Sequence, residues 1–323
     1  MTNAHKMFCV LFAGLLGSSV PVLADTLRVG VISESATNWP LRVAEEKGFF
    51  REQDLDVQVT VQVDSAKLLA GLAQGTFDVT HQAADHFVSG VQDGKDVFIF
   101  MTIARPVYDF VVRPEIGTIA ELRGKTIAVD RPTTGYWLLF SKIFAQNGLP
   151  PDAYNLLPNM GGAEKRRQAV QDDRAQGTFL NPPLNLKAVL AGLRRLTSIS
   201  DHIKDIPGTA GGAKREWARQ HEATLLAYLS AYMRAVDWTL DRKNRDEMLA
   251  IAAKRGKADR RELEGSYDTF VQNGLVRSAE LSMGGIQRVL DLLVESGQLP
   301  PAETRPEKYA DPSYQQKAMA KAR

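Results

Sequence analysis

The chain has 323 residues, and its 40 Lys and Arg against 38 Asp and Glu give a formal net charge of +2 at pH 7. A charge so close to balance gives no electrostatic reason to expect binding to nucleic acid or to a membrane surface, since both are polyanionic. The single cysteine, Cys9, lies near the N-terminus. The rest of the chain therefore offers no disulfide, no thiolate nucleophile and no cysteine-based metal site.

The first 24 residues are predicted to be a secretory signal peptide. Lys6 precedes an apolar run at residues 7–17, and Val22 and Ala24 occupy the small-residue positions of a cleavage site. The alternative is an N-terminal membrane anchor, but the run is shorter than the ~20 residues that a spanning helix needs. We expect cleavage after Ala24, a periplasmic location, and enough remaining chain for two domains.

After the signal peptide, the first hundred residues alternate strand and helix patterns. Helices are expected at residues 40–47, with Pro40 in the first turn and Gly48 past the end, and at residues 65–75. Apolar runs or strict alternation predict strands at residues 27–33, 55–63, 77–80 and 97–103. This order predicts a mainly parallel sheet that is covered on both faces.

The alternation restarts near residue 118, and the last third is helical. Thr118 and Glu121 have capping-box spacing at the start of residues 118–124. Strands are expected at residues 125–130, 176–183 and 194–200, and helices at 133–148, 163–171, 245–254 and 280–296. Apolar residues that recur every three or four positions predict one long amphipathic helix: Trp217, His221, Leu225, Tyr228, Tyr232, Val236 and Leu240.

Known enzyme signatures are absent from the sequence. The tripeptide GKT at residues 124–126 resembles the end of a phosphate loop, but Ile119 stands where a glycine is needed, and a strand follows instead of a helix. His221 and Glu222 lack the second histidine of a zinc motif. We therefore expect a binding protein that is not an enzyme and uses no cofactor or metal.

Polar and aromatic residues cluster instead where predicted strands end, which is where open α/β sheets bind ligands. The clusters follow the strands at residues 27–33, 77–80, 125–130 and 176–183. Their candidate ligand-binding residues are Asn38, Trp39, Pro40, His81, Gln82, Asp85, Arg131, Thr133, Thr134, Gly135, Tyr136 and Asn181.

Each of these residues also has an ordinary structural role open to it. Asn38 and Thr134 can cap helices, Trp39 can pack against the core, and His81 can pair with Asp85 four positions later. A ligand role for the whole set is supported by the convergence of the clusters on one edge of the predicted sheets.

The chemistry of the clusters suits a small organic anion. Aromatic faces at Trp39 and Tyr136 supply apolar area, and the N-termini of the helices that follow Asn38 and Thr133 favour anionic oxygens. Arg131 could pair with a carboxylate or sulfonate, and Arg105 is a second candidate. A neutral, pyrimidine-like base is the alternative ligand.

Several strings resemble the solute-binding proteins of ABC importers, in the branch with nitrate-, sulfonate- and thiamine-pyrimidine-type (NMT1/THI5-like) receptors. The strings are WPLRVAEEKGFF, LRGKTIAVD, AYMRAVDWTLDRKNRDE and the tail YADPSYQQKA. The resemblance implies an α/β, two-lobed periplasmic-binding-protein fold (Venus flytrap, type II) with two crossover strands and C-terminal helices. It also implies a small-molecule ligand and the membrane subunits of an ABC permease as partners, and we expect a monomer.

By this resemblance, residues 25–106 and 203–323 form lobe 1 and residues 107–202 form lobe 2, with crossings near residues 105–108 and 200–204. One departure is the segment DDRAQGTFLNPP, which lacks the Asp-Ala that the family usually has there, and this bears on Asn181. Two alternatives stay open. One is a pyrimidine-precursor-synthesising enzyme, whose cysteine-rich motif is missing here, and the other is a ligand-sensing partner of a membrane receptor.

Overall fold

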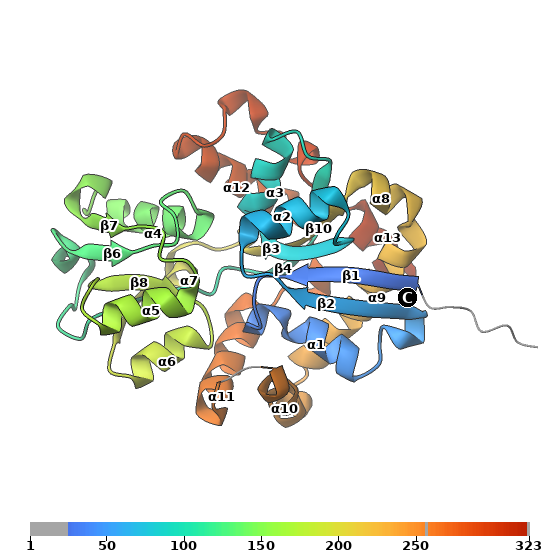
Figure 1. Cartoon of the computed structure of the whole chain (residues 1–323), viewed down its shortest axis with the longest axis horizontal. Coiled ribbons are helices and arrows are strands. Elements are labelled where there is room, and N and C mark those ends of the chain that lie inside the picture. The colour runs from blue at the N-terminus through green and yellow to red at the C-terminus, as the bar shows by residue number, and fades with distance from the viewer. Residues whose placement is uncertain (1–24, 256–257, 322–323) are drawn as a thin grey trace, which may run out of the picture.

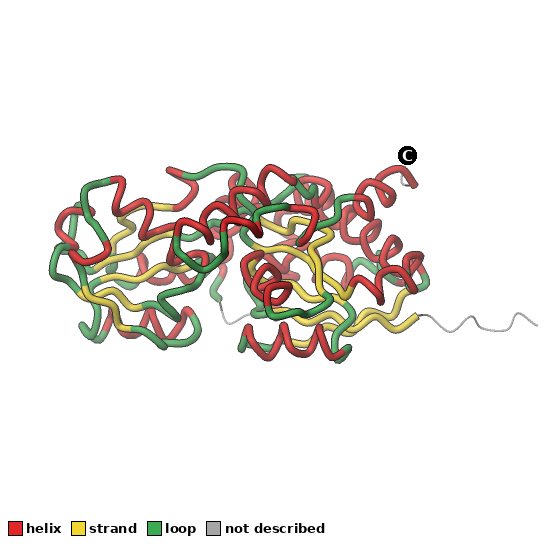
Figure 2. The backbone as a smooth tube through the Cα atoms, turned by 90° about the horizontal axis from the view of Figure 1, so that it is seen from above, coloured by secondary structure: helices red, strands yellow, loops and turns green. Residues whose placement is uncertain are grey.

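The computed structural model describes residues 25–255 and 258–321. The predicted signal peptide and its cleavage site lie outside these described residues. The strands form two five-stranded sheets, which lie side by side along the long axis of the molecule in Figure 1. Figure 2 shows the strands as two separate groups with helices around them. This is the α/β fold of two sheets with C-terminal helices that the sequence predicted.

The first sheet has the strand order β2-β1-β3-β10-β4. β1 is parallel to β2 and β3, whereas β10 runs antiparallel to β3 and β4. The strands are β1 Asp25–Val31, β2 Leu55–Val61, β3 Val79–Ala83, β4 Val97–Ala104 and β10 Thr209–Lys214. Three helices of the N-terminal segment alternate with these strands: α1 Trp39–Glu46, α2 Ser65–Gln74 and α3 Ala84–Gln92.

The second sheet has the order β7-β6-β8-β5-β9. β6 is parallel to β7 and β8, and β5 is antiparallel to β8 and β9. The strands are β5 Asp109–Val112, β6 Thr126–Ala128, β7 Asn155–Leu157, β8 Gly177–Leu180 and β9 Arg194–Ser198. The helices are α4 Gly135–Gln146, α5 Ala163–Gln171, α6 Leu184–Leu190 and α7 Ile199–His202. The chain passes to this sheet after β4 and returns after α7.

The C-terminal segment covers the first sheet with helices. The longest, α9, buries Leu225, Tyr228, Leu229, Tyr232 and Val236, which are all fully buried. Two later helices also contact the second sheet's helices, since α11 touches α6 and α12 touches α4. The helices are α8 Arg215–Gln220, α9 Glu222–Leu240, α10 Arg245–Arg255, α11 Arg260–Thr269, α12 Met283–Glu295 and α13 Ser313–Lys321.

Several sequence predictions need correction. The expected single helix from Trp217 to Leu240 is two helices, because His221 has φ −121° and ψ 38°, outside the helical region. Residues 118–124 form only a short 3-10 turn, Ile119–Leu122. The strand expected at residues 77–80 is β3, Val79–Ala83, so His81 and Gln82 lie within the strand instead of after it. Side chains alternate between the faces of a strand, so these two point to opposite faces.

Three strands were not predicted, β5, β7 and β10, and the sequence of β10 lacks a strand pattern altogether. β10 contains Gly211 and Gly212, and glycine is depleted in strands. A Cβ at Gly211 would lie 2.4 Å from Met101 Cε, and one at Gly212 would lie 2.1 Å from Phe87 Cε1. Neighbouring side chains already fill the space over this strand, so only glycine fits. Over the described ranges, no helix is both long and apolar enough to cross a bilayer.

Candidate ligand-binding site

The carboxyl ends of the parallel strands in the two sheets approach each other. β1 and β2 point from the first sheet toward the second in Figure 1. The loops and helix starts that follow β1, β3, β6 and β8 lie at this edge, where α/β sheets bind ligands. We call this region the intersheet site and define it as residues 33–40, 80–86, 130–136 and 179–185 together with Tyr108.

A hydrogen bond joins the two sides of the intersheet site directly. Asp85, at the start of α3, accepts a bond from the backbone N–H of Gly135 at 3.2 Å. Gly135 is the first residue of α4, a 12-residue helix, so the carboxylate lies at a helix N-terminus, where a negative charge is favoured. Arg131 also crosses the gap and donates from Nη2 to Ser65 Oγ at 3.2 Å. The predicted residues Asp85 and Gly135 are therefore brought together, and the predicted Arg131 bridges the same gap at Ser65.

The contact between the sheets extends to both edges. On one edge, Lys142 of α4 and Glu295 of α12 form an ion pair at 2.6 Å. On the other, a Cβ on Gly265 of α11 would lie 2.4 Å from Leu186 Cδ2 of α6. Figure 1 shows α11 and α12 on opposite sides of the region between the sheets. A residual cavity of about 20 Å³ remains beside Asp85 and Tyr136, with room for roughly one water molecule. The structure is thus closed around the site.

Aromatic rings line the second-sheet side. The rings of Tyr108 and Tyr136 have centroids 4.0 Å apart, and Tyr108 lies 5.8 Å from Phe179. Burial raises the pKa of both tyrosines, and the nearby Asp85 adds to the effect at each, so both phenols stay neutral. The predicted residue Tyr136 therefore lies in an apolar wall that also carries the hydroxyl groups of Tyr108 and Tyr136.

His81 is fully committed to the core of the first sheet. Asn38 Nδ2 donates to the Ser33 carbonyl at 2.7 Å, so Asn38 Oδ1 is the acceptor for His81 Nδ1 at 3.0 Å. Nε2 then accepts from the Tyr228 hydroxyl at 2.7 Å. Burial, with a smaller effect of Arg42, lowers the pKa of His81 to about 3. The neutral ring has no free nitrogen, and it does not pair with Asp85.

Trp39 and Pro40 also lie in the core. The Trp39 side chain is 5% exposed, and its ring centroid lies 6.5 Å from that of Tyr267 and 6.0 Å from that of Phe270. Pro40 occupies the first turn of α1, as predicted. The indole thus packs α1 against α11 and the turn after it, so most of its surface is already covered by protein.

The remaining candidates differ in how far they are engaged. Gln82 is 1% exposed; its Nε2 donates to Thr80 Oγ1 at 3.2 Å, while its Oε1 has no partner among the described residues. Thr134 Oγ1 donates to Asp130 Oδ1 at 2.8 Å and does not cap α4. Thr133 is exposed and Asn181 is half-buried. Among these candidates, Gln82 therefore has a buried polar atom, Oε1, that is not engaged by the described residues.

Residues 36–245 match the protein family described as NMT1/THI5 like. The chain belongs to the NMT1/THI5-like family. This confirms the resemblance that the sequence strings carried.

Individual relatives of this NMT1/THI5-like protein agree in extent and fold. YtlA of Bacillus subtilis (strain 168), a protein named for a binding role, is 22% identical over 286 residues, which are 85% of this chain and 84% of YtlA. The periplasmic nitrate-binding protein NrtA from Synechocystis PCC 6803 has a TM-score of 0.80 at 18% identity, over 92% of this chain and 88% of NrtA. The alkanesulfonate-binding protein SsuA from Xanthomonas axonopodis pv. citri, bound to MOPS, has a TM-score of 0.75 at 16% identity, over 88% of this chain and 98% of SsuA.

One charged residue of this family member that the sequence analysis missed is Arg166 of α5. Its side chain is buried, and its guanidinium lies over the ring of Phe179 with 4.4 Å between Cζ and the ring centroid. Nη2 donates to the Phe179 carbonyl at 3.2 Å. The sequence AEKRRQAVQ of α5 is mostly polar, which is typical of a solvated helix, so only the tertiary structure separates Arg166 from its neighbours.

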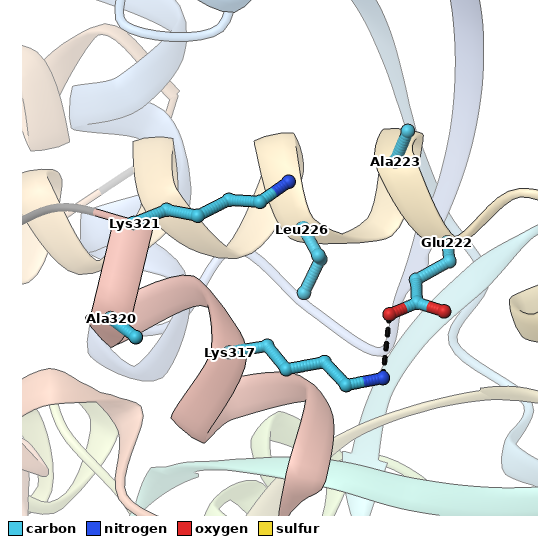
Figure 3. A pocket seen from close by; sticks show the side chains of 6 residues that line it. All are labelled: Glu222, Ala223, Leu226, Lys317, Ala320 and Lys321. Atoms are coloured by element: carbon cyan, nitrogen blue, oxygen red, sulfur yellow. Dashed lines mark hydrogen bonds and ion pairs between the residues drawn. The ribbon is translucent and has the colours of Figure 1, made fainter.

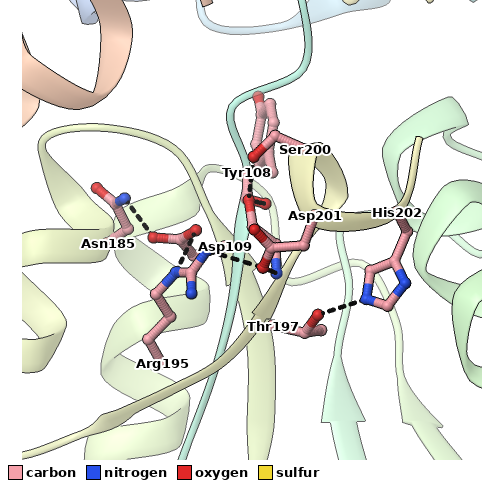
Figure 4. Close-up of polar contacts among 9 residues, drawn as sticks. Tyr108, Asp109, Asn185, Arg195, Thr197, Ser200, Asp201 and His202 are labelled. Carbon is pink, nitrogen blue, oxygen red and sulfur yellow. Dashed lines mark hydrogen bonds and ion pairs between the residues drawn. The ribbon is translucent and has the colours of Figure 1, made fainter. Parts of the chain in front are cut away.

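A polar network surrounds the crossing residue Tyr108, whose carbonyl accepts a bond from Ser198 Oγ at 3.0 Å (Figure 4). Asp109 accepts from Asn185 Nδ2 at 2.7 Å and from Arg195 Nε at 3.0 Å. Arg195 also binds Asp201 at 2.9 Å, and Asp201 in turn caps α7. The network ties the start of β5 to the end of β9, so both crossings are anchored on the second sheet.

A surface hollow between α9 and α13 lies away from this site. It has a volume of about 430 Å³ and is lined by Glu222, Ala223 and Leu226 of α9 and by Lys317, Ala320 and Lys321 at α13 (Figure 3). Lys317 is paired with Glu222 at 2.7 Å. The polar groups that line this hollow do not converge on one point, so we describe it as a groove between two packed helices. Within residues 25–255 and 258–321, no group of three or more His, Cys, Asp and Glu could hold a metal ion.

Proposed function

We propose that this chain is the periplasmic solute-binding component of an ABC importer and that it captures a small organic anion, a sulfonate or carboxylate, at the intersheet site. The observation that carries the proposal is the hydrogen bond between Asp85 in α3, beside the first sheet, and Gly135 in α4, beside the second. It lies at the strand ends where α/β sheets bind ligands. Two crossings allow the sheets to separate as rigid bodies and to close again around a solute.

The names of the compared proteins favour an anionic ligand. NrtA is named for nitrate and SsuA for alkanesulfonates, and both share the fold over most of this chain. Tyr108, Tyr136 and Phe179 supply an apolar wall that a bare inorganic ion would not need. An organic anion uses both features, so we favour it over nitrate and over a neutral pyrimidine.

We propose that Gln82, Asp85, Gly135 and Tyr136 contact the ligand, with Arg131, Thr133, Thr134 and Asn181 around them. Asn38, Trp39, Pro40 and His81 instead support the site from the core, because their polar atoms or rings are already engaged. Lobe 1 consists of residues 25–106 and 203–323, and lobe 2 of residues 107–202. The closed monomer delivers its ligand to the membrane subunits of the permease.

The alternatives raised by the sequence gain less support. The relatives described above are named for binding, and the chain after Cys9 has no cysteine for the motif of the enzyme alternative. A receptor partner would use the same closed form, so a ligand is the common requirement. We therefore place the test at ligand binding.

The test is a thermal-shift screen of residues 25–323 against alkane- and arenesulfonates, aromatic carboxylates, nitrate and pyrimidines. A ligand at a hundred times its dissociation constant stabilises the folded state by about 2.7 kcal/mol, which raises the melting temperature by roughly 2–4 °C per kcal/mol for a chain of this size. We expect organic anions to give the largest shifts. Shifts from pyrimidines alone would contradict the ligand class, and silence across the panel would contradict the binding function.

Site variants locate the binding. Gln82→Leu removes a buried amide whose Nε2 donates one N–H to Thr80 and has a second N–H for an anionic oxygen. We therefore expect affinity for the best anion to fall up to about tenfold, the value of one hydrogen bond. Lys317→Ala alters the hollow between α9 and α13 and serves as the control, with affinity unchanged. The reverse pattern would move the ligand out of the intersheet site.

A further inference from the structure

Arg166 is a buried cation that forms no ion pair with a carboxylate among the described residues. Its side chain is 4% exposed, Nη1 donates to the Gly161 carbonyl at 2.7 Å, and Nη2 donates to the Phe179 carbonyl at 3.2 Å. Nε is buried and has no hydrogen-bond acceptor among the described residues. A guanidinium has five N–H donors and carries its charge at all physiological pH values, so two neutral carbonyls leave it under-satisfied.

The other buried arginines show how this chain normally satisfies such a group. Arg42 is also 4% exposed and is paired with Glu34 and Glu45. Arg167, the next residue after Arg166, is 6% exposed and is paired with Glu164 at 2.6 Å. Burying an unpaired charge is costly, and within the described part of the chain Arg166 is the buried arginine that lacks a carboxylate partner.

Arg166 lies at the strand ends that form the intersheet site. Phe179, which the guanidinium both covers and binds, belongs to the end of β8. Burial lowers the pKa of Arg166, while the negative charge of Asp130, just after β6, opposes this effect. Asp130 itself accepts a bond from Thr134 at 2.8 Å. The guanidinium therefore lies on Phe179, one of the rings of the aromatic wall, and close enough to Asp130, in the loop before α4, to feel its charge.

The predicted anion site at the start of α4 is already taken. Asp85 accepts the first N–H of this helix, so the ligand's anionic group meets a carboxylate there. Like charges at this distance repel. A second positive group at the same edge is thus needed, and Arg166 supplies it.

We propose that Arg166 is the counter-charge of the ligand: when the lobes separate, a sulfonate or carboxylate reaches its Nε–H and Nη–H groups, and the organic part packs on Tyr108, Tyr136 and Phe179. This inference rests on the proposed function. A planar fork of donors matches two anionic oxygens at once. The ligand class that follows is an organic monoanion with an apolar or aromatic body, and a neutral analogue of the same shape binds weakly.

The experiment measures dissociation constants by calorimetry for the best anion of the thermal-shift panel and, as probes in every case, benzenesulfonate and the neutral benzenesulfonamide. The variants are Arg166→Gln, Arg166→Lys and the matched control Arg167→Gln, in residues 25–323. We expect Arg166→Gln to weaken anion binding at least about 30-fold, as a loss of ~2 kcal/mol does. Arg166→Lys keeps the charge without the fork and should recover part of the affinity, and Arg167→Gln should bind within about threefold of the wild type.

The outcomes distinguish a failure of the Arg166 assignment from a failure of the proposed binding function. Anion binding by the wild type that survives Arg166→Gln and Arg166→Lys would overturn the role of Arg166 and leave the binding function intact. Equal affinity of the wild type for benzenesulfonamide and benzenesulfonate, with no anion preferred in the panel, would also overturn the role of Arg166. This test needs no variant, so it holds even if the Arg166 variants fail to fold. No binding of any compound by the wild type would overturn the proposed function, and this assignment with it.

Discussion

The hydrogen bond between Asp85 and Gly135 is expected to hold the two sheets together when no ligand is bound. Replacing Asp85 by Ala removes one N–H···O bond to a carboxylate at 3.2 Å and one favourable charge at the N-terminus of α4. These contributions are about 0.5–1.5 kcal/mol for the bond and 0.3–1 kcal/mol for the helix dipole. Asp85→Ala should therefore shift the ligand-free equilibrium toward the open form by about 1–2 kcal/mol, which is a factor of roughly 5–30.

Single-molecule FRET measures this equilibrium directly. After the signal peptide the chain has no cysteine, so two cysteines introduced at the exposed positions Val63 and Lys125, one near each sheet, are the only labelling sites. The matched control is Asp93→Ala at the other end of α3, since among the described residues the Asp93 side chain pairs only with the partly exposed Lys95. A distance distribution that is the same for wild type and Asp85→Ala would refute the reasoning, because the hydrogen bond would then contribute nothing to closure.

Two further predictions concern the first sheet. The pKa of His81 is lowered to about 3 in the folded state and is about 6.5 in an unfolded chain, so the unfolded state binds the proton first as pH falls. The free energy of unfolding should therefore be unaffected by His81 above pH 6.5 and should drop by about 2 kcal/mol between pH 6.5 and 5. Urea unfolding at a series of pH values checks this, and the same slope in His81→Gln would contradict it. Gly212→Ala places a Cβ 2.1 Å from Phe87 Cε1 and should lower the free energy of unfolding by about 1–3 kcal/mol. The control Gly162→Ala, whose Cβ would have nothing within 4 Å, should lower it little. Equal urea midpoints for the two variants would contradict this, because they would show that β10 can move to make room.

The regular elements could be predicted where the sequence itself carries their period. The alternation in residues 55–63 and the Pro40–Gly48 boundaries of α1 are local signals, and both appear in the structure. β10 has no such signal, because its glycines are set by Met101 and Phe87, which approach from elsewhere in the chain. The crossings near residues 105–108 and after α7 followed from the family resemblance.

The candidate site could be predicted as a region more easily than as a set of side chains. The rule that strand ends bind ligands led to Asp85, Gly135 and Tyr136, which the structure brings together. The same rule included His81 and Trp39, whose side chains pack in the core. His81 lies within β3, and the sequence gives no sign of which face of a strand a polar residue takes. Trp39 begins α1 and packs on Tyr267, a residue far away in the sequence. Arg166 was missed for the opposite reason: its helix is polar throughout, and its burial depends on contacts with β8.

The position of β10 has a consequence for how the chain acquires its structure during synthesis. The second sheet uses residues 109–198 only, so all its strands are available before any residue of β10 is made. The first sheet must wait, because β10 lies between β3 and β4 and pairs with both. Until residue 214 is present, β3 and β4 have no partner on the sides that face each other, and the central pairing of that sheet joins segments more than a hundred residues apart. Such long-range pairing is slow to form, so the second sheet should fold as an early, continuous unit and the first sheet should be completed last.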